Sequence, residues 1–268
     1  MQFTDIAAGV PFVAVPPTLE RPDAPVVVAW HLMDPPRTEA ALAAALPLAG
    51  LEAWRIYLGL PLTGARGPGA EETMRLGYED AVANLFGPIT DQAAAEFPAA
   101  LDALRARFGA RGPLAVVGGS LGSAVAQLVA IDRADVTAAV LVSPVAQLRT
   151  VVAVNERRFG FAYPWHPAAE RIADRLDFVA RAEETARHAP AVRIVVGAED
   201  GAGIRTSSAD LRDALTKHYA DPTRVDLVTV DGMGHAFADE PGIEPAPQTA
   251  HAAEVDRLAV DWLRRHLP

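Results

Sequence analysis

Residues 114–131 read LAVVGGSLGSAVAQLVAI, and this stretch decides the fold. The apolar run 114–117 has the length and composition of a buried strand, and the Ala-rich run after Gly122 is typical of a helix. Between them stands GGSLG, residues 118–122, a G-x-S-x-G motif in a strand-turn-helix setting. Small residues beside Ser120 permit a strained turn with positive φ, which lifts the hydroxyl clear of the sheet. The motif predicts that Ser120 is a nucleophile.

This turn has two other interpretations. A Gly-rich turn can be purely structural, with the serine serving only as a helix cap. A dinucleotide-binding turn fits poorly, because G-x-G-x-x-G would require glycine at Val117. The acid and base residues described below favour the interpretation of Ser120 as a nucleophile over both.

Apolar runs on both sides of this stretch alternate with Ala-rich helical segments. That alternation predicts an α/β fold in which a mostly parallel twisted sheet carries helices on both faces. The expected strands are Val26–Trp30, Trp54–Leu58, Leu114–Val117, Ala138–Val142, Val192–Val196 and Val225–Val230. The expected helices are Thr38–Leu48, Thr90–Phe108, Leu121–Ile131, Ser207–Tyr219 and Ala252–His266. Met1–Ile6 and Phe12–Val15 could add antiparallel edge strands.

Two segments depart from simple strand-helix alternation. Pro61–Pro88 begins rich in Gly and Pro and predicts a long surface loop with a short polar helix. Pro144–Pro190 contains the aromatic run RRFGFAYPWHP and then a helical stretch, Ala168–Ala186. We expect it to form a cap inserted between consecutive strands of a single domain spanning residues 1–268.

Composition and charge exclude several classes of protein. The chain has no cysteine, which removes thiolate metal sites and a cysteine nucleophile, and its scattered histidines form no HExxH pair. A formal charge of −10 disfavours nucleic acid and anionic lipid partners. The start of the chain lacks a basic leader, and no uncharged stretch is long enough to span a bilayer. These features predict a soluble cytoplasmic protein that needs no metal or other cofactor.

A serine hydroxyl needs a base to become nucleophilic, and the base needs an orienting carboxylate. The run VRIVV ends in GAED, residues 197–200, and the run VDLVTV is followed by DGMGH, residues 231–235. Both loops leave strands at the edge where open α/β sheets build their sites. We expect Asp200 as the acid and His235 as the base. The weaker candidates are Glu199, Asp226 and Asp231 for the acid and His251 for the base.

With its elbow GGSLG, acid loop GAED and histidine loop GMGH in that order, the sequence resembles the α/β-hydrolases from Pro25 to its C-terminal end. The resemblance implies that family's fold and a serine-dependent acyl transfer mechanism on Ser120, Asp200 and His235. The Leu121 N–H is expected to serve as one oxyanion donor. The second oxyanion donor is expected in the loop after the strand Val26–Trp30. In family members this loop often begins with His-Gly. Here His31 is followed by Leu32, which leaves that donor open between Leu32 and Met33.

The expected reaction is hydrolysis of a small-molecule carboxylic ester through an acyl-enzyme on Ser120. Thioesterase, acyltransferase or perhydrolase activity would use the same residues, and a non-catalytic binding protein is a further alternative. Phe161, Tyr163 and Trp165 either line an apolar substrate site or merely anchor the cap. His31 either packs under its loop or contacts substrate. The sequence does not indicate an oligomeric state.

Overall fold

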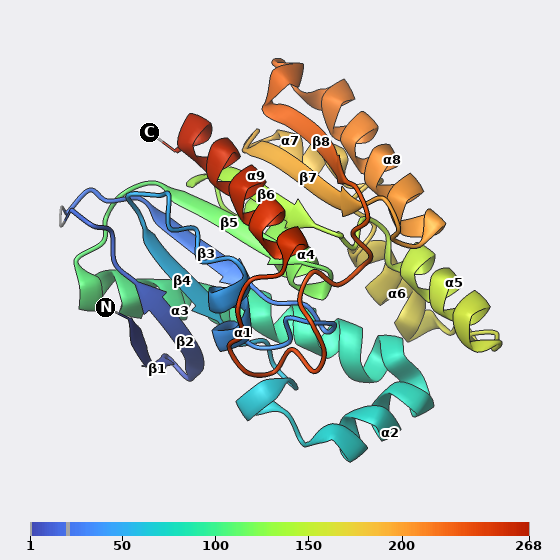
Figure 1. The fold of residues 1–268 in the computed structure, drawn as a ribbon. Coiled ribbons are helices and arrows are strands. Elements are labelled where there is room, and N and C mark those ends of the chain that lie inside the picture. Colours follow the sequence, from blue (N-terminus) through green and yellow to red (C-terminus); the bar gives the residue numbers. More distant parts are fainter. Residues whose placement is uncertain (1, 20–21, 268) are drawn as a thin grey trace.

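The computed structural model describes residues 2–19 and 22–267, and a single sheet runs through it (Figure 1). The sheet has eight strands in the order β1-β2-β4-β3-β5-β6-β7-β8. In chain order the strands are β1 (Phe3–Ala7), β2 (Val10–Val15), β3 (Val26–Trp30), β4 (Trp54–Leu58), β5 (Leu114–Gly119), β6 (Val136–Val142), β7 (Ala191–Gly197) and β8 (Val225–Val230). The mostly parallel α/β sheet expected from the sequence is confirmed.

Parallel pairing joins β4, β3, β5, β6, β7 and β8, and all six strands expected from apolar runs are present. β1 and β2 form an antiparallel edge, with β2 pairing against β4. The first expected edge strand began at Met1, which lies outside the described residues. All five residues of β3 are buried, as strands covered on both faces require.

Helices cover both faces of the sheet (Figure 1). The α-helices are α1 (Glu39–Ala45), α2 (Ala70–Ala81), α3 (Gly87–Phe108), α4 (Leu121–Asp132), α5 (Leu148–Phe159), α6 (Pro167–Arg175), α7 (Ala182–Ala186), α8 (Ala202–His218) and α9 (Ala250–His266). Short helices η1 (Gly64–Arg66), η2 (Val82–Phe86) and η3 (Pro222–Arg224) complete the chain. α1 and α9 pack on the face that carries Val27 and Ala29, whereas α3, α4 and α8 pack on the face that carries Val26 and Val28. Alternate residues of each strand therefore supply two separate cores.

The segment Pro61–Pro88 differs from the expected surface loop. It is mostly helical, because α2 continues through η2 into α3. Asp80 breaks α2 with φ −167° and ψ 92°, and its Oδ1 accepts a 2.9 Å hydrogen bond from the Ala83 N–H. Pro88 stands in the first turn of α3, where its missing N–H costs nothing. A Cβ on Gly87 would lie 2.7 Å from Ile172 Cδ1, so this glycine permits close packing against α6.

Residues 144–190, called the cap below, leave the sheet after β6 and return at β7. The cap contains α5, which the sequence reasoning did not identify, and two helices, α6 and α7, where one helical stretch was expected. α5 packs on α8, and α6 packs on η2. Asp80 fastens the cap to α2 by accepting a hydrogen bond from the Tyr163 hydroxyl and by pairing with His166 Nε2 at 2.7 Å. The cap is thus held on two sides.

Candidate active site

The turn between β5 and α4 has the geometry that its sequence predicts. Ser120 adopts φ 44° and ψ −117° and stands at the start of α4. A Cβ on Gly118 would lie 2.3 Å from Gly122 O, and one on Gly122 would lie 2.4 Å from His31 O. No side chain fits at either position, so glycine lets α4 approach β3 and β5 closely.

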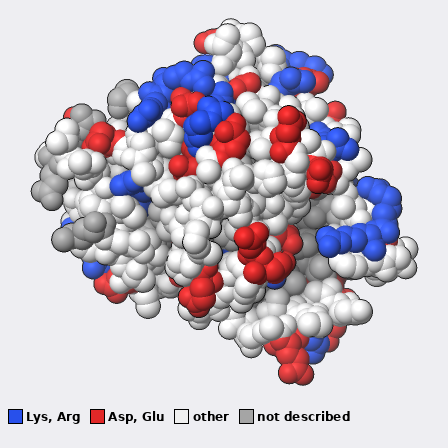
Figure 2. Space-filling model, in the orientation of Figure 1, with Lys and Arg blue, Asp and Glu red and all other residues white. Residues whose placement is uncertain are grey.

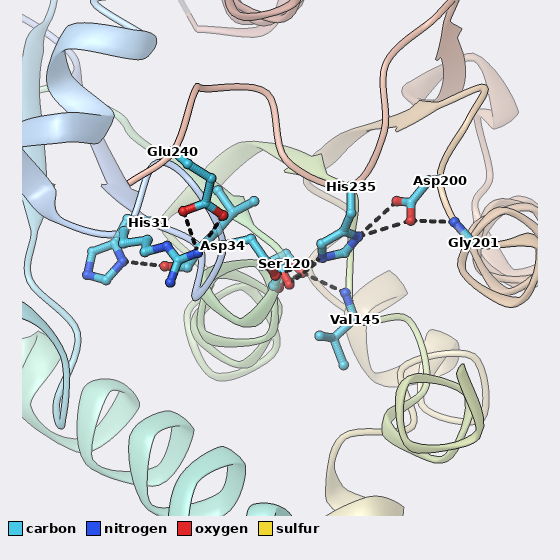
Figure 3. A network of polar contacts seen from close by, with 11 residues as sticks. His31, Asp34, Ser120, Val145, Asp200, Gly201, His235 and Glu240 are labelled. Carbon is cyan, nitrogen blue, oxygen red and sulfur yellow. Dashed lines mark hydrogen bonds and ion pairs between the residues drawn. The ribbon is translucent and has the colours of Figure 1, made fainter. Parts of the chain in front are cut away.

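Three loops bring Ser120, His235 and Asp200 together (Figure 3). His235 Nε2 is 2.9 Å from Ser120 Oγ, and His235 Nδ1 is 2.9 Å from Asp200 Oδ2 and 3.1 Å from Asp200 Oδ1. The acid and histidine loops are joined by a 2.9 Å hydrogen bond from the Glu199 N–H to Met233 O. A Cβ on Gly197 would lie 2.1 Å from the same oxygen, which explains the glycine there.

The weaker candidates for the acid and base lie elsewhere. Glu199 is exposed beside the buried Asp200. Asp226 pairs with Arg193 at 2.6 Å. Asp231 is exposed, and His251 lies at the start of α9.

Asp200 controls the protonation of His235. The Asp200 side chain is 3% exposed, and its Oδ1 also accepts a 2.6 Å hydrogen bond from the Gly201 N–H. Burial acts to lower the pKa of His235, but the hydrogen bond and charge of Asp200, with the charge of Asp34, outweigh burial and raise that pKa above its ordinary value. An imidazole held in this way can take a proton from Ser120 and keep it while the reaction proceeds.

Two residues beside Ser120 have backbone N–H groups that are candidates for oxyanion donors. Leu121 opens α4 next to Ser120, and Met33 lies on the loop after β3; both residues line the cavity beside Ser120. The Leu32 N–H donates to Pro36 O at 3.2 Å and is therefore occupied. Within the described residues, the N–H groups of Met33 and Leu121 make no hydrogen bond. Of the two alternatives left open by the sequence, the geometry favours Met33.

Ser123 supports the turn from behind and was not identified from the sequence. Its hydroxyl donates to Ser120 O at 2.6 Å and accepts a 3.0 Å hydrogen bond from the Val145 N–H. The side chain is fully buried. One hydroxyl thus joins the nucleophile turn to the first residues of the cap. A serine three residues into a helix is too common to have predicted this.

A cavity of about 470 Å³ opens beside Ser120. Its wall is largely apolar on the side formed by α5, where Leu148, Val151 and Val154 line it. Four polar residues line it besides Ser120, Asp200 and His235: Asp34, Asn155, Arg158 and Glu199. The cavity has room for a small acyl group next to the nucleophile.

The residues expected from the sequence to bind substrate do not line this cavity. Phe161 is 46% exposed, and Tyr163 packs edge-on against Trp165 with ring centroids 4.8 Å apart. These rings anchor the cap, because Tyr163 is hydrogen-bonded to Asp80. Much of the apolar lining comes instead from α5, where Leu148, Val151 and Val154 recur at every third residue.

His31 likewise lies beneath the site. It is fully buried, with Nδ1 2.6 Å from Leu32 O and Nε2 accepting a hydrogen bond from the Leu60 N–H at 3.2 Å. Burial lowers the pKa of His31 to about 4. His31 is therefore neutral and structural, and it does not reach the cavity.

Metal binding and membrane insertion are two other kinds of function on which residues 2–19 and 22–267 bear. Among these residues no group of three or more His, Cys, Asp or Glu is arranged to hold a metal ion. In the same ranges, no helix combines the length and apolar character needed to cross a bilayer.

Comparison with known proteins identifies the fold. No protein-family model matches the sequence, and the curated proteins contain no match to it. The structure of TT1662 from Thermus thermophilus is similar with a TM-score of 0.71 at 17% identity, over 99% of this chain and 97% of that chain. A cold-adapted esterase from an Arctic intertidal metagenomic library gives 0.61 at 20% identity, over 100% of this chain and 93% of the esterase.

A third similar structure is an acylaminoacyl peptidase from Pyrococcus horikoshii, with a TM-score of 0.65 at 12% identity. All of this chain is covered, but it spans only 41% of the peptidase chain. These neighbours are α/β-hydrolase fold proteins, and the chain described here has that fold. The resemblance carried by GGSLG, GAED and GMGH predicted it.

Proposed function

We propose that this protein is a serine hydrolase that cleaves carboxylic esters through an acyl-enzyme on Ser120. One observation carries the proposal: the His235 imidazole is hydrogen-bonded to Ser120 Oγ on one side and to the Asp200 carboxylate on the other, at 2.9 Å each. This is the arrangement that converts a serine hydroxyl into a nucleophile. The esterase and peptidase neighbours support a hydrolase on this fold.

In the proposed reaction His235 Nε2 takes the Ser120 proton as Oγ attacks the carbonyl carbon. The tetrahedral oxyanion accepts hydrogen bonds from the Leu121 and Met33 N–H groups, and the positive end of α4 adds to its stabilisation. The intermediate collapses when the ester C–O bond breaks, and His235 passes its proton to the departing oxygen. Water, deprotonated by His235, then attacks the acyl-enzyme; the bond from the acyl carbon to Ser120 Oγ breaks, His235 returns the proton to Oγ, and the acid is released.

Labelling with a fluorophosphonate tests the proposal. This electrophile reacts with serines activated by a base, so we expect one adduct on Ser120 in the wild type and a large loss of labelling in His235→Ala. Ser120→Ala is the control for labelling elsewhere. Absence of any Ser120 adduct in folded wild-type protein would exclude the assignment.

Esters are proposed over amides because an alcohol departs from the tetrahedral intermediate more readily than an amine, and because apolar residues line the cavity beside Ser120 and suit an acyl group. A panel of p-nitrophenyl esters and the corresponding p-nitroanilides distinguishes them, with ester hydrolysis expected to dominate. Hydroxylamine or an alcohol added during turnover distinguishes hydrolysis from acyl transfer, since an acyltransferase would divert most acyl groups to the acceptor.

A further inference from the structure

Asp34 is a cavity residue that the triad does not use. It follows Met33 on the loop after β3, and its Oδ2 lies 3.9 Å from His235 Nε2, the nitrogen that faces Ser120 Oγ. The side chain is 49% exposed, and it makes no hydrogen bond with the residues that the structure describes. Asp200 already orients the imidazole from its other nitrogen, so Asp34 is free to contact a ligand (Figure 3).

A carboxylate at this place is unfavourable for a neutral substrate. The distances from His235 Nε2 keep Asp34 Oδ2 within roughly 7 Å of Ser120 Oγ, a range over which charges interact strongly in a site that is partly closed to water. The negative charge of the intermediate develops on the former carbonyl oxygen, whose carbon is bonded to Ser120 Oγ, and Asp34 repels this charge. A cation on the substrate would add an attraction to Asp34 that offsets this repulsion.

The position of Asp34 indicates which part of the substrate would carry that cation. His235 Nε2 delivers its proton to the departing oxygen, so the departing group must lie against Nε2 and hence near Asp34. Leu148, Val151 and Val154 lie on α5, a different element, and suit an uncharged acyl group, whereas Asn155 and Arg158 line the cavity from the last turns of the same helix. The acyl and departing groups thus meet surfaces of different chemistry.

We propose that Asp34 selects acyl substrates whose departing group carries a positive charge, such as esters of quaternary or protonated amino alcohols. The inference rests on the proposed serine hydrolase function. In the reaction the ester C–O bond breaks, the departing amino alcohol takes the proton that His235 received from Ser120, and water later releases the acid.

Besides Asp34 and Asp200, two charged residues line the cavity, and their effects on a charged substrate must be distinguished from that of Asp34. Glu199 carries the same charge and is exposed, whereas the exposed Arg158 carries the opposite charge. Figure 2 shows acidic side chains near the centre of one face and basic side chains projecting at its right margin, so that face has no single sign. The net charge of −10 would attract any cation weakly. Glu199→Gln therefore provides a matched control, because it makes the same charge change in the same cavity.

The test compares acetylcholine with 3,3-dimethylbutyl acetate, an isostere in which a carbon replaces the charged nitrogen. kcat/KM for both esters is measured by acid release in wild type, Asp34→Asn and Glu199→Gln. We expect Asp34→Asn to reduce the ratio of kcat/KM for acetylcholine to kcat/KM for the neutral ester about tenfold. This is the order of magnitude expected for a half-exposed ion pair in a partly closed site. Because Asp34 also raises the pKa of His235, both esters are expected to change together in this variant, so only their ratio tests the proposal, and thermal unfolding shows that the variant is folded. Glu199→Gln should change the ratio less than about threefold.

The outcomes separate this inference from the proposed function. If fluorophosphonate fails to label Ser120, the proposed function fails and this inference with it. If Ser120 is labelled but acetylcholine is not cleaved, or the ratio is unchanged in Asp34→Asn, only the inference is overturned. An equal loss in Asp34→Asn and Glu199→Gln also overturns it, because the preference would then come from a general negative potential.

Discussion

Replacing Asp200 by Asn tests how the acid controls His235. In the wild type, Asp200 Oδ1 accepts from the Gly201 N–H at 2.6 Å, and Oδ2 lies 2.9 Å from His235 Nδ1. An asparagine must keep its oxygen toward Gly201, because the N–H there can only donate. Its NH₂ group then faces Nδ1. The imidazole must accept at Nδ1 and carry its proton on Nε2, where it can no longer receive the Ser120 proton.

The expected loss follows from this wrong tautomer. An acid-to-amide change at a Ser-His-Asp site with intact geometry lowers kcat about 10⁴-fold, which corresponds to about 5.4 kcal/mol of transition-state stabilisation. KM should change little, since Asp200 does not bind the substrate. Glu199→Gln is the matched control, because the neighbouring side chain is exposed and, among the described residues, forms no hydrogen bond or ion pair with His235.

The assay is p-nitrophenyl acetate hydrolysis, with thermal unfolding to show that the variant is folded. A loss of less than tenfold in Asp200→Asn would refute the reasoning, because Nε2 would then still accept the proton. A larger loss in Glu199→Gln than in Asp200→Asn would place the acid one residue earlier.

Three further predictions concern the base, the cavity and the cap. In a pH-rate profile, kcat/KM should rise with pH through one ionisation whose midpoint lies above the ordinary histidine range. The reason is that Asp200 and Asp34 raise the pKa of His235, and only the neutral imidazole accepts a proton. A midpoint below that range would contradict this. Val151→Phe should fill the apolar side of the cavity and lower kcat/KM for p-nitrophenyl octanoate about tenfold more than for the acetate; equal effects would place the acyl group elsewhere. Trp165→Ala should lower the melting temperature by a few degrees and affect esters of all acyl lengths alike, because Trp165 packs on Tyr163 outside the cavity; a loss confined to long acyl chains would show that Trp165 contacts substrate.

Local sequence predicted the sheet well. Strands such as Val26–Trp30 are apolar throughout because helices cover both faces of the sheet. Such a continuous apolar run can be recognised in the sequence without knowledge of its tertiary contacts. The turn at Ser120 was equally visible, because Gly118 and Gly122 lie where no Cβ fits. The loops with Asp200 and His235 follow strands whose ends must meet at one edge of the sheet.

The cap and its contacts were not predictable in the same way. The Gly and Pro residues of Pro61–Pro88 are typical of a loop, yet Gly87 permits close packing against Ile172 and Pro88 lies in the first turn of α3. The aromatic residues around Trp165 looked like a substrate pocket, but which rings face a cavity depends on tertiary contacts such as Tyr163 with Asp80. Asp34 was missed because its nearness to His235 joins residues far apart in the chain.

The most direct test of the account is to trap the covalent intermediate with p-nitrophenyl dimethylcarbamate, whose carbamoyl-enzyme hydrolyses slowly. When the carbamate is added in excess over the protein, one equivalent of p-nitrophenol per protein molecule should be released. Peptide mass spectrometry should then find the dimethylcarbamoyl group on Ser120. Ser120→Ala should release none above background. Release by the wild type without an adduct on Ser120, or equal release by Ser120→Ala, would contradict a serine hydrolase acting through this residue.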